Sequence, residues 1–273
     1  MNSFALVLYS LLFALSLTAC FEPKEGCLDI AATNFDAAAD KDCCCAYPKL
    51  VLTVNQVFDT LLFRNDSLYE ASNGHLFRIK SVAFYLSDFQ LFQNGVVHSV
   101  SDTLRLHTFL GPDTSTLRFT NDFQLVRRTP VNYVVGTFRQ DANFEQVSIR
   151  LGLSKEAQKV IPSKTTVDHP LSPQPDSLWR GQTNGFVFLQ AVVVRDSMGA
   201  TQPDTLRFLQ SDLGQRFIEA SGLYVHPTGY DFHLVLKADY KQLFEGVNWS
   251  IHDILAWKVA IVSNMTNAFS VSQ

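Results

Sequence analysis

The sequence is poor in charged residues and has no excess of basic ones. Only 18% of its 273 residues are charged, and 22 Lys and Arg against 26 Asp and Glu give a formal net charge of −4. Without a basic field, the chain lacks the electrostatic attraction that recruits nucleic acid, so we expect no nucleic-acid partner. The hydrophobic share of 47% is nevertheless high enough for a folded domain with a large core.

Catalytic sequence motifs are also missing. The chain contains no Gly-x-Ser-x-Gly elbow, no Gly-x-Gly-x-x-Gly fingerprint, no phosphate-binding loop and no His-Glu-x-x-His pair. Its seven histidines are never four residues apart, so no helical metal-binding pair is expected. We therefore expect a protein that is not an enzyme.

The N-terminal segment predicts export. Residues 4–17 form an uncharged apolar run that is too short for a comfortable transmembrane helix and is typical of a signal peptide. Leu17-Thr18-Ala19-Cys20 follows, the pattern that bacterial lipoprotein maturation cuts before lipidating the cysteine. We expect removal of residues 1–19 and a membrane anchor at Cys20, and because Phe21 rather than Asp follows it, an outer-membrane location. An ordinary secretory signal with an incidental cysteine is the alternative.

All five cysteines lie before residue 46, at positions 20, 27, 43, 44 and 45. Without the lipidated cysteine four remain, which in an oxidising compartment favours two disulfides within a small arm, residues 20–48. Cys43, Cys44 and Cys45 cannot all pair with one another, so we expect Cys27 to reach one of them and leave a vicinal pairing for the rest. A soft-metal site of those three thiolates for Cu(I) or Zn(II) is the alternative.

Oxygen-bearing side chains recur between these cysteines at intervals that suit Ca²⁺, so the arm is a candidate calcium site. The candidate ligands are Asp29, Asn34, Asp36, Asp40 and Asp42. The segment resembles the Cys- and Asp-rich arms of secreted Bacteroidetes-type proteins and lipoproteins, which are similar to thrombospondin type 3 calcium repeats. A solvated acidic turn held by disulfides is the alternative, because the glycine and terminal glutamate of an EF-hand loop are missing.

The rest of the chain, residues 49–273, alternates apolar and polar residues in short runs rich in Val, Ile, Thr, Phe and Tyr. The expected strands are residues 50–58, 76–86, 89–92, 103–109, 116–120, 132–138, 147–151, 185–194, 204–209, 230–237 and 256–262, with Asn94-Gly95 as a hairpin turn. Helix is expected only at residues 154–160 and 239–244. Without βαβ spacing, this pattern predicts an all-β domain, an antiparallel β-sandwich or flattened barrel with few short helices.

Residues 162–182 form the longest irregular stretch and contain four prolines. Long loops on a rigid β scaffold are where binding residues concentrate. His169 lies in this proline-rich loop, and His226 lies just before Pro227. His233 alternates with Phe232 and Leu234, so its side chain is expected on the polar face of a strand.

The order of several local features resembles the copper-binding MbnP-like domain family of bacterial lipoproteins and periplasmic proteins. The matching stretches are residues 82–87, Asn94-Gly95, residues 147–153, His169-Pro170-Leu171, Leu178-Trp179 up to Gly185-Phe186, residues 239–244 and residues 264–269. The resemblance implies an all-β exported protein that binds copper. In some members a di-haem peroxidase-like partner first oxidises a tryptophan of the metal site.

This resemblance gives His169, Trp179, His226 and His233 as the residues among which copper ligands are expected. Members of the family carry a Trp-x-Trp pair shortly before Gly-Tyr, and Arg180 and Gln182 stand in those places here. Trp179 lies one position early. A binding or adhesion module on the same β scaffold, without a metal, is the alternative function.

Overall fold

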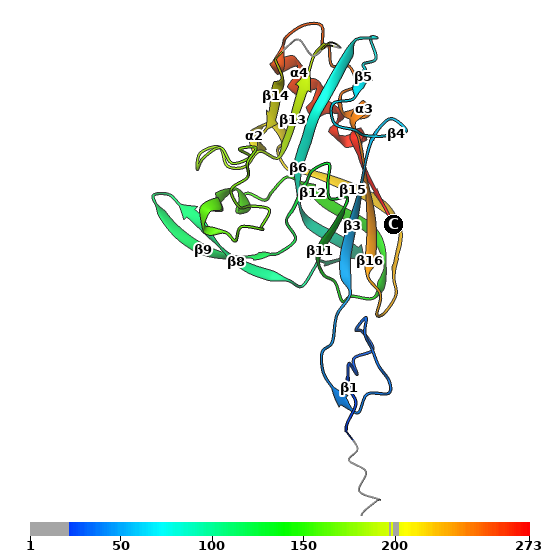
Figure 1. The fold of residues 1–273 in the computed structure, drawn as a ribbon. Helices are drawn as coiled ribbons and strands as arrows, with labels where there is room; N and C mark the ends of the chain where they lie inside the picture. Colours follow the sequence, from blue (N-terminus) through cyan, green and yellow to red (C-terminus); the bar gives the residue numbers. More distant parts are fainter. Residues whose placement is uncertain (1–21, 197, 199–201) are drawn as a thin grey trace, which may run out of the picture.

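Two β-sheets face one another and enclose one continuous apolar core (Figure 1). The computed structural model describes residues 22–196, 198 and 202–273. The expected signal peptide and the lipidation site Cys20 lie outside the described residues. Aromatic rings join the two sheets, since Phe84 meets Phe269 at 5.3 Å and Phe144 meets Phe232 at 5.9 Å between ring centroids.

The larger sheet has eight strands, with β6 at its centre. Its main order is β14 (Asp204–Phe208), β13 (Leu189–Val194), β6 (Leu76–Gln93), β12 (Ala142–Leu151) and β15 (Arg216–His226). Three short strands also pair with β6, namely β5 (Leu68–Glu70), β7 (Val96–His98) and β10 (Gln124–Val126).

The smaller sheet has five strands. Its order is β11 (Asn132–Thr137), β3 (Lys49–Phe58), β16 (Phe232–Asp239) and β17 (Phe269–Ser272), with β4 (Leu61–Leu62) beside β3. Within the described residues both sheets stay open, so the fold is an all-β sandwich and not a closed barrel. Strands β3 and β16 run parallel, an exception to the antiparallel pairing expected from the sequence.

Strand β6 joins two segments that the sequence predicts as separate strands. Ser148 pairs with Gln90 and Arg150 pairs with Ser87, so Asp88 and Phe89 together oppose one residue of β12. This is a β-bulge, and Asp88 takes the positive φ of 49° that it requires. The polar Ser87-Asp88 pair therefore interrupts the pattern of β6 without ending the strand.

The hairpins follow their turn residues. Gln93 pairs with Val96 across Asn94-Gly95, both with positive φ, which confirms the expected turn between β6 and β7. Strands β8 (Thr103–Leu110) and β9 (Asp113–Thr120) form a second hairpin that extends away from the sandwich (Figure 1). The middle of β8 is held to the loop that precedes η2 (Pro162–Lys164), because Ile161 N–H donates to the His107 carbonyl at 2.9 Å.

The C-terminal helix corrects a prediction. Residues 256–262 were expected as a strand, but they lie in α4 (Ile254–Ala268). The buried residues of α4 are Trp257, Ile261, Met265 and Ala268, three to four apart, which is the helical period and not the strand period. Asp253 caps the first turn, accepting from Ala256 N–H at 3.0 Å.

The other helices are short. The expected helix at residues 239–244 is confirmed as α3 (Tyr240–Leu243), with Asp239 as its cap. Residues 154–160 form only a 3₁₀ turn, η1 (Ala157–Lys159), and a second turn, η2 (Pro162–Lys164), begins the proline-rich loop. Helix α2 (Gln210–Leu213) precedes β15. No helix in the described part of the chain is long and apolar enough to cross a membrane.

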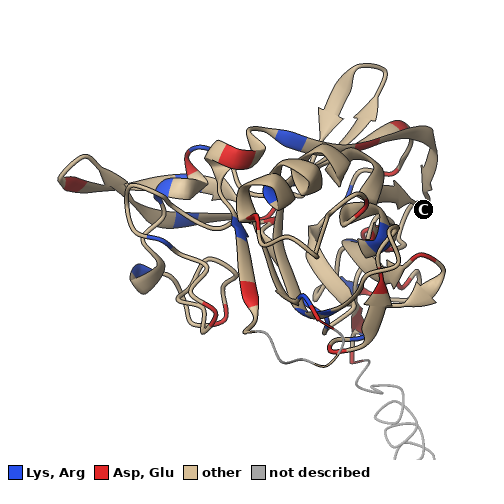
Figure 2. Ribbon diagram, turned by 90° about the horizontal axis from the view of Figure 1, so that it is seen from above, with Lys and Arg blue, Asp and Glu red and all other residues tan. Residues whose placement is uncertain are grey.

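The arm forms a small lobe below the sandwich (Figure 1). Its regular structure is a parallel pair of two-residue strands, β1 (Glu25–Gly26) and β2 (Lys41–Asp42). Asp29 meets Arg139 of the sandwich at 3.0 Å, and the Arg139 guanidinium lies 3.6 Å from the centre of the Tyr47 ring. Acidic and basic residues are interspersed over the ribbon of the described chain (Figure 2).

Candidate functional site

His169 is a buried candidate ligand with one ring nitrogen that makes no hydrogen bond. Burial lowers its pKa to about 4, so the ring is neutral at pH 7. Its Nδ1 accepts from Leu171 N–H at 3.1 Å, and its Nε2 is buried without a hydrogen-bond partner. The ring packs edge-on against Phe123 with centroids 5.7 Å apart.

The backbone around His169 is fixed by a succession of turns. His169 N–H donates to the Thr166 carbonyl at 3.0 Å, and Ser172 N–H donates to the His169 carbonyl at 2.9 Å. Tyr85 of β6 donates its hydroxyl to the Pro170 carbonyl at 3.1 Å. The proline-rich loop therefore presents His169 from a backbone tied to the central strand of the larger sheet.

Trp179 lies at the other end of the same loop, where the chain begins to rejoin the sheet. It forms an isolated antiparallel bridge with Phe186, and Val187 N–H donates to the Leu178 carbonyl at 2.7 Å. The indole stacks on Phe109 of β8 with centroids 6.3 Å apart and an interplanar angle of 12°. Its Nε1 is buried and unpartnered.

An apolar pocket of about 420 Å³ opens beside this aromatic pair. Its lining includes Phe109, Ile161, Pro162, Pro173, Gln174 and Trp179. Trp179 is therefore placed against a cavity, whereas His169 packs on Phe123.

The prolines of the loop make it a candidate site in the sequence. The sequence does not reveal that Phe109 lines the same pocket, because Phe109 comes from a hairpin far away in the chain.

His226 is occupied by the protein itself. It is 2% exposed, and its Nδ1 and Nε2 each lie 2.6 Å from a backbone carbonyl oxygen, of Gln140 and Tyr230 respectively. Its ring also packs on Phe138 and Phe232. A carbonyl oxygen stands in front of each nitrogen, so neither is open to a metal, and this histidine joins the end of β15 to two neighbouring loops.

His233 lies on the outer face of β16, exposed, as its alternation with Phe232 and Leu234 predicts. The candidate histidines do not converge in the described chain. Its one group of three or more His, Cys, Asp and Glu residues with ligand atoms within 4.8 Å of one another is Cys27, Asp42 and Cys45. The two cysteines of that group are joined as a disulfide, so their sulfurs are not available as thiolates.

The five candidate calcium ligands are used in the internal hydrogen bonds of the arm, and no three of the four carboxylates come within 4.8 Å of one another. Asp29 and Asp36 accept from the backbone two residues on, as Asx turns do, and Asp36 pairs with Lys24 at 2.7 Å. Asp40 and Asp42 accept from backbone N–H groups of Lys24 and Leu28. These contacts tie the carboxylates to the backbone of the arm and to Lys24.

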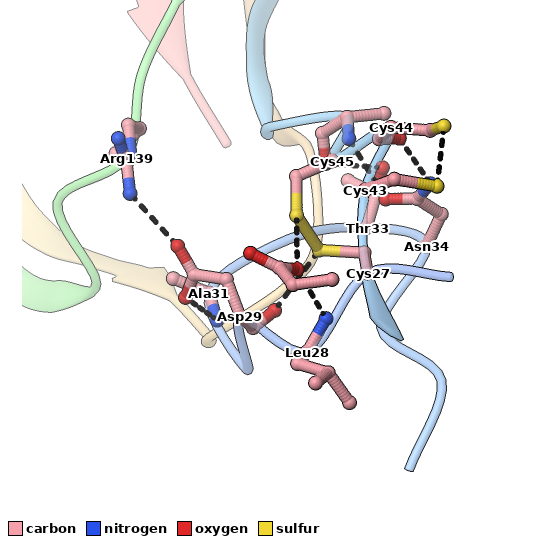
Figure 3. The surroundings of a disulfide bond; sticks show 12 residues. Cys27, Leu28, Asp29, Ala31, Thr33, Asn34, Cys43, Cys44, Cys45 and Arg139 are labelled. Carbon is pink, nitrogen blue, oxygen red and sulfur yellow. Dashed lines mark hydrogen bonds and ion pairs between the residues drawn. A yellow bond between two sulfur atoms is a disulfide. The ribbon is translucent and has the colours of Figure 1, made fainter. Parts of the chain in front are cut away.

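Asn34 completes the arm by bridging two backbone groups. Its side-chain amide donates to the Cys44 carbonyl and accepts from Ala46 N–H, both at 2.8 Å. Cys27 pairs with Cys45, which confirms that Cys27 reaches one of the three consecutive cysteines (Figure 3). The second disulfide expected from the even number of cysteines is not formed, because Cys43 and Cys44 are free thiols.

The fold defines the chain as a member of the all-β sandwich class. No family model matches its sequence, and no curated protein matches it. A solved structure with a similar arrangement is MbnP from Methylosinus trichosporium, which is 12% identical. The match covers 81% of this chain and 97% of that chain, with a TM-score of 0.43.

Proposed function

We propose that this chain is an exported, lipid-anchored binding protein whose proline-rich loop holds a copper ion through His169. The observation that carries the proposal is the His169 ring, which is neutral at pH 7 and has a buried Nε2 without a partner. Imidazole nitrogen is a favoured copper donor, and it binds only when deprotonated. The sequence features shared with the MbnP-like family support the same reading.

Coordination through Nε2 requires a small rearrangement. In the neutral ring Nδ1 accepts from Leu171 N–H, so the ring proton lies on Nε2. A metal at Nε2 moves that proton to Nδ1 and breaks the hydrogen bond from Leu171, which costs about 1 kcal/mol.

Trp179 has a different part in the proposal. An unmodified indole offers only an N–H donor, so Trp179 cannot ligate copper as it stands. It would become a ligand after oxidation, the step that a di-haem peroxidase-like partner would supply. His226 is left out of the ligand set because both of its nitrogens face backbone carbonyls.

Copper titration of the purified chain tests this proposal. Cu(I) is added without oxygen and Cu(II) in air, to a chain carrying Cys43→Ser and Cys44→Ser so that thiolates do not contribute. We expect one equivalent to bind, and His169→Ala to weaken binding at least tenfold. His98→Ala is the matched control, since His98 also has a buried, unpartnered Nε2 but packs on Phe144 elsewhere. Unchanged affinity in His169→Ala would refute the assignment.

The membrane anchor is tested separately. Metabolic labelling with a fatty acid should modify the chain, and Cys20→Ser should abolish the label. Fractionation of inner and outer membranes then checks the proposed outer-membrane location. Calcium titration of the wild-type chain tests the candidate calcium site in the arm. If the arm is instead a solvated acidic turn, no calcium should bind.

A second candidate function is a binding or adhesion module without a metal. The specific observation is the pocket of about 420 Å³ beside stacked Phe109 and Trp179. Aromatic faces beside an apolar cavity suit a sugar ring, whose C–H groups pack against them. Binding on a glycan array that Trp179→Ala removes, with no stoichiometric copper binding, would favour this function over the first.

A further inference from the structure

The arm presents two free thiols side by side (Figure 3). The Sγ atoms of Cys43 and Cys44 are 2.6 Å apart. Cys45 is already joined to Cys27, and within the described residues no other free cysteine exists. Each of the two thiols therefore has the other as its nearest available sulfur.

The surrounding contacts fix this pair. Cys43 N–H donates to the Gly26 carbonyl at 2.9 Å, and the Cys44 carbonyl accepts from the Asn34 side chain at 2.8 Å. Cys44 has a φ of 60°, in the left-handed region that is unfavourable for a non-glycine residue. The disulfide at Cys45 fixes the next residue. The arm thus holds Cys44 beside Cys43 against the ordinary preference of its backbone.

The two sulfurs differ in their surroundings. Cys44 is exposed and Cys43 is half-buried. The hydrogen bond with Cys44, together with burial, raises the pKa of Cys43 to about 11, so Cys43 keeps its proton at neutral pH. Cys44 is the sulfur that an incoming molecule reaches first.

We propose that Cys43 and Cys44 form a thiol–disulfide exchange site for small disulfides. The Cys44 thiolate attacks one sulfur of a disulfide RSSR, whose S–S bond breaks and releases one RS⁻, which takes up a proton. Cys43 then gives up its proton and attacks the Cys44 sulfur, expelling the second RS⁻. The products are a Cys43–Cys44 vicinal disulfide and two RSH, so the two electrons lost by the cysteine pair reduce RSSR.

The distance between the sulfurs favours this chemistry over a soft-metal site. A zinc ion with bonds of about 2.3 Å in tetrahedral geometry needs its sulfur ligands roughly 3.8 Å apart. The observed separation is 2.6 Å, nearer to the S–S bond of about 2.05 Å in a disulfide. Cys45 cannot provide a third thiolate because it is oxidised.

Peptide mapping by mass spectrometry tests the proposal on the full chain purified in detergent. The chain is incubated in glutathione buffers of increasing oxidised fraction, quenched with acid and alkylated. We expect the peptide with Cys43 and Cys44 to lose two hydrogens and escape alkylation in oxidised buffer. Mild reduction should restore two alkylated thiols there while Cys27–Cys45 stays intact.

Single variants test the order of the two steps. With Cys43→Ser, a glutathione mixed disulfide should accumulate on Cys44, because no neighbouring thiol resolves it. With Cys44→Ser, reaction at Cys43 should be at least tenfold slower. Wild-type thiols that remain alkylatable in oxidised glutathione would overturn the proposal, and so would equal reaction rates in the two variants. The wild-type measurement does not depend on either variant folding.

Discussion

At the scale of single residues, Gly152 occupies a position that no side chain can share. Its φ is 107°, and an added Cβ would lie 2.3 Å from the Phe188 ring. Gly152 N–H donates to the Tyr85 carbonyl at 2.8 Å, so the residue cannot move away without losing the contact between β12 and β6. We expect Gly152→Ala to lower the free energy of unfolding by about 3 kcal/mol or more.

Denaturant unfolding of Gly152→Ala and Gly181→Ala measures this effect. Gly181 also has a positive φ, 87°, but an added Cβ would have nothing within 4 Å. Its replacement should cost only about 1 kcal/mol, from backbone strain alone. Equal losses at the two positions would show that the Phe188 ring does not set the requirement at Gly152.

Asp122 is a buried carboxyl that should make stability depend on pH. Burial raises its pKa from 3.8 to about 7, although Phe89 N–H donates to its Oδ2 at 2.9 Å. The folded chain therefore holds this proton more tightly than the unfolded chain does. The protonated Asp122 carboxyl gives its full contribution to the free energy of unfolding below about pH 4. This contribution, at most roughly 2 to 4 kcal/mol, is lost as the pH rises to about 7.

The variant Asp122→Asn should remove this loss. Thermal unfolding at several pH values measures the difference in stability between Asp122→Asn and the wild type. Between pH 4 and pH 7 the variant should become more stable relative to the wild type. Asp113→Asn, at an exposed position of β9, is the control and should follow the wild-type profile. A constant difference across this range would contradict the raised pKa of Asp122.

The sequence identified the loop of the candidate site but not its neighbours. His169 and Trp179 stood out because they interrupt a proline-rich segment, which is local information. The stacking of Trp179 on Phe109 and the packing of His169 on Phe123 depend on where the β8–β9 hairpin folds back. His226 resembled a ligand in sequence because nothing local reveals that two carbonyls surround its ring.

At the scale of elements, the sequence predicts strands in which apolar and polar residues alternate without interruption. It does not predict an interrupted strand, β15, or a helix built from β-prone residues, α4. Strand β15 was missed because Ser221-Gly222 reads as a turn, whereas the structure accommodates these residues at an irregularity in the pairing with β12. Helix α4 was taken for a strand because Val259, Ile261 and Val262 favour β structure. Its packing decides otherwise, since Trp257 lies buried and donates its Nε1 proton to the Asn248 carbonyl at 2.9 Å.

The cap of α4 gives a prediction at this scale. Because a β-prone sequence needs support at its start, removing the Asp253 carboxylate should leave the first turn without its acceptor for Ala256 N–H. We expect Asp253→Ala to reduce the free energy of unfolding by about 1 kcal/mol, and Asp253→Ser, which keeps a capping oxygen, to change it little. Chemical denaturation followed by circular dichroism measures both, and similar losses for both would exclude a capping role.

At the scale of the whole molecule, the arm and the sandwich are held together by different kinds of contact. The apolar core begins at Leu50 and contains no residue of the arm. The arm instead relies on its disulfide and on side-chain hydrogen bonds to its own backbone. The arm meets the sandwich through exposed contacts of Arg139 with Asp29 and Tyr47.

This independence predicts that the sandwich folds without the arm. A chain beginning at Pro48 keeps the carbonyl that accepts from Phe138 N–H at 2.8 Å, and it loses the Asp29–Arg139 ion pair and the contact of Arg139 with Tyr47. Exposed contacts of these kinds contribute about 0 to 1 kcal/mol each. The two losses together amount to at most about 2 kcal/mol, so the melting temperature should fall by less than about 8 °C, which differential scanning calorimetry measures. A drop of tens of degrees in the shortened chain would instead mean that the arm is part of the folding unit.

In the full chain, Arg139→Ala removes the contacts of Arg139 with Asp29 and Tyr47. This variant should speed proteolysis within the arm while leaving the sandwich intact.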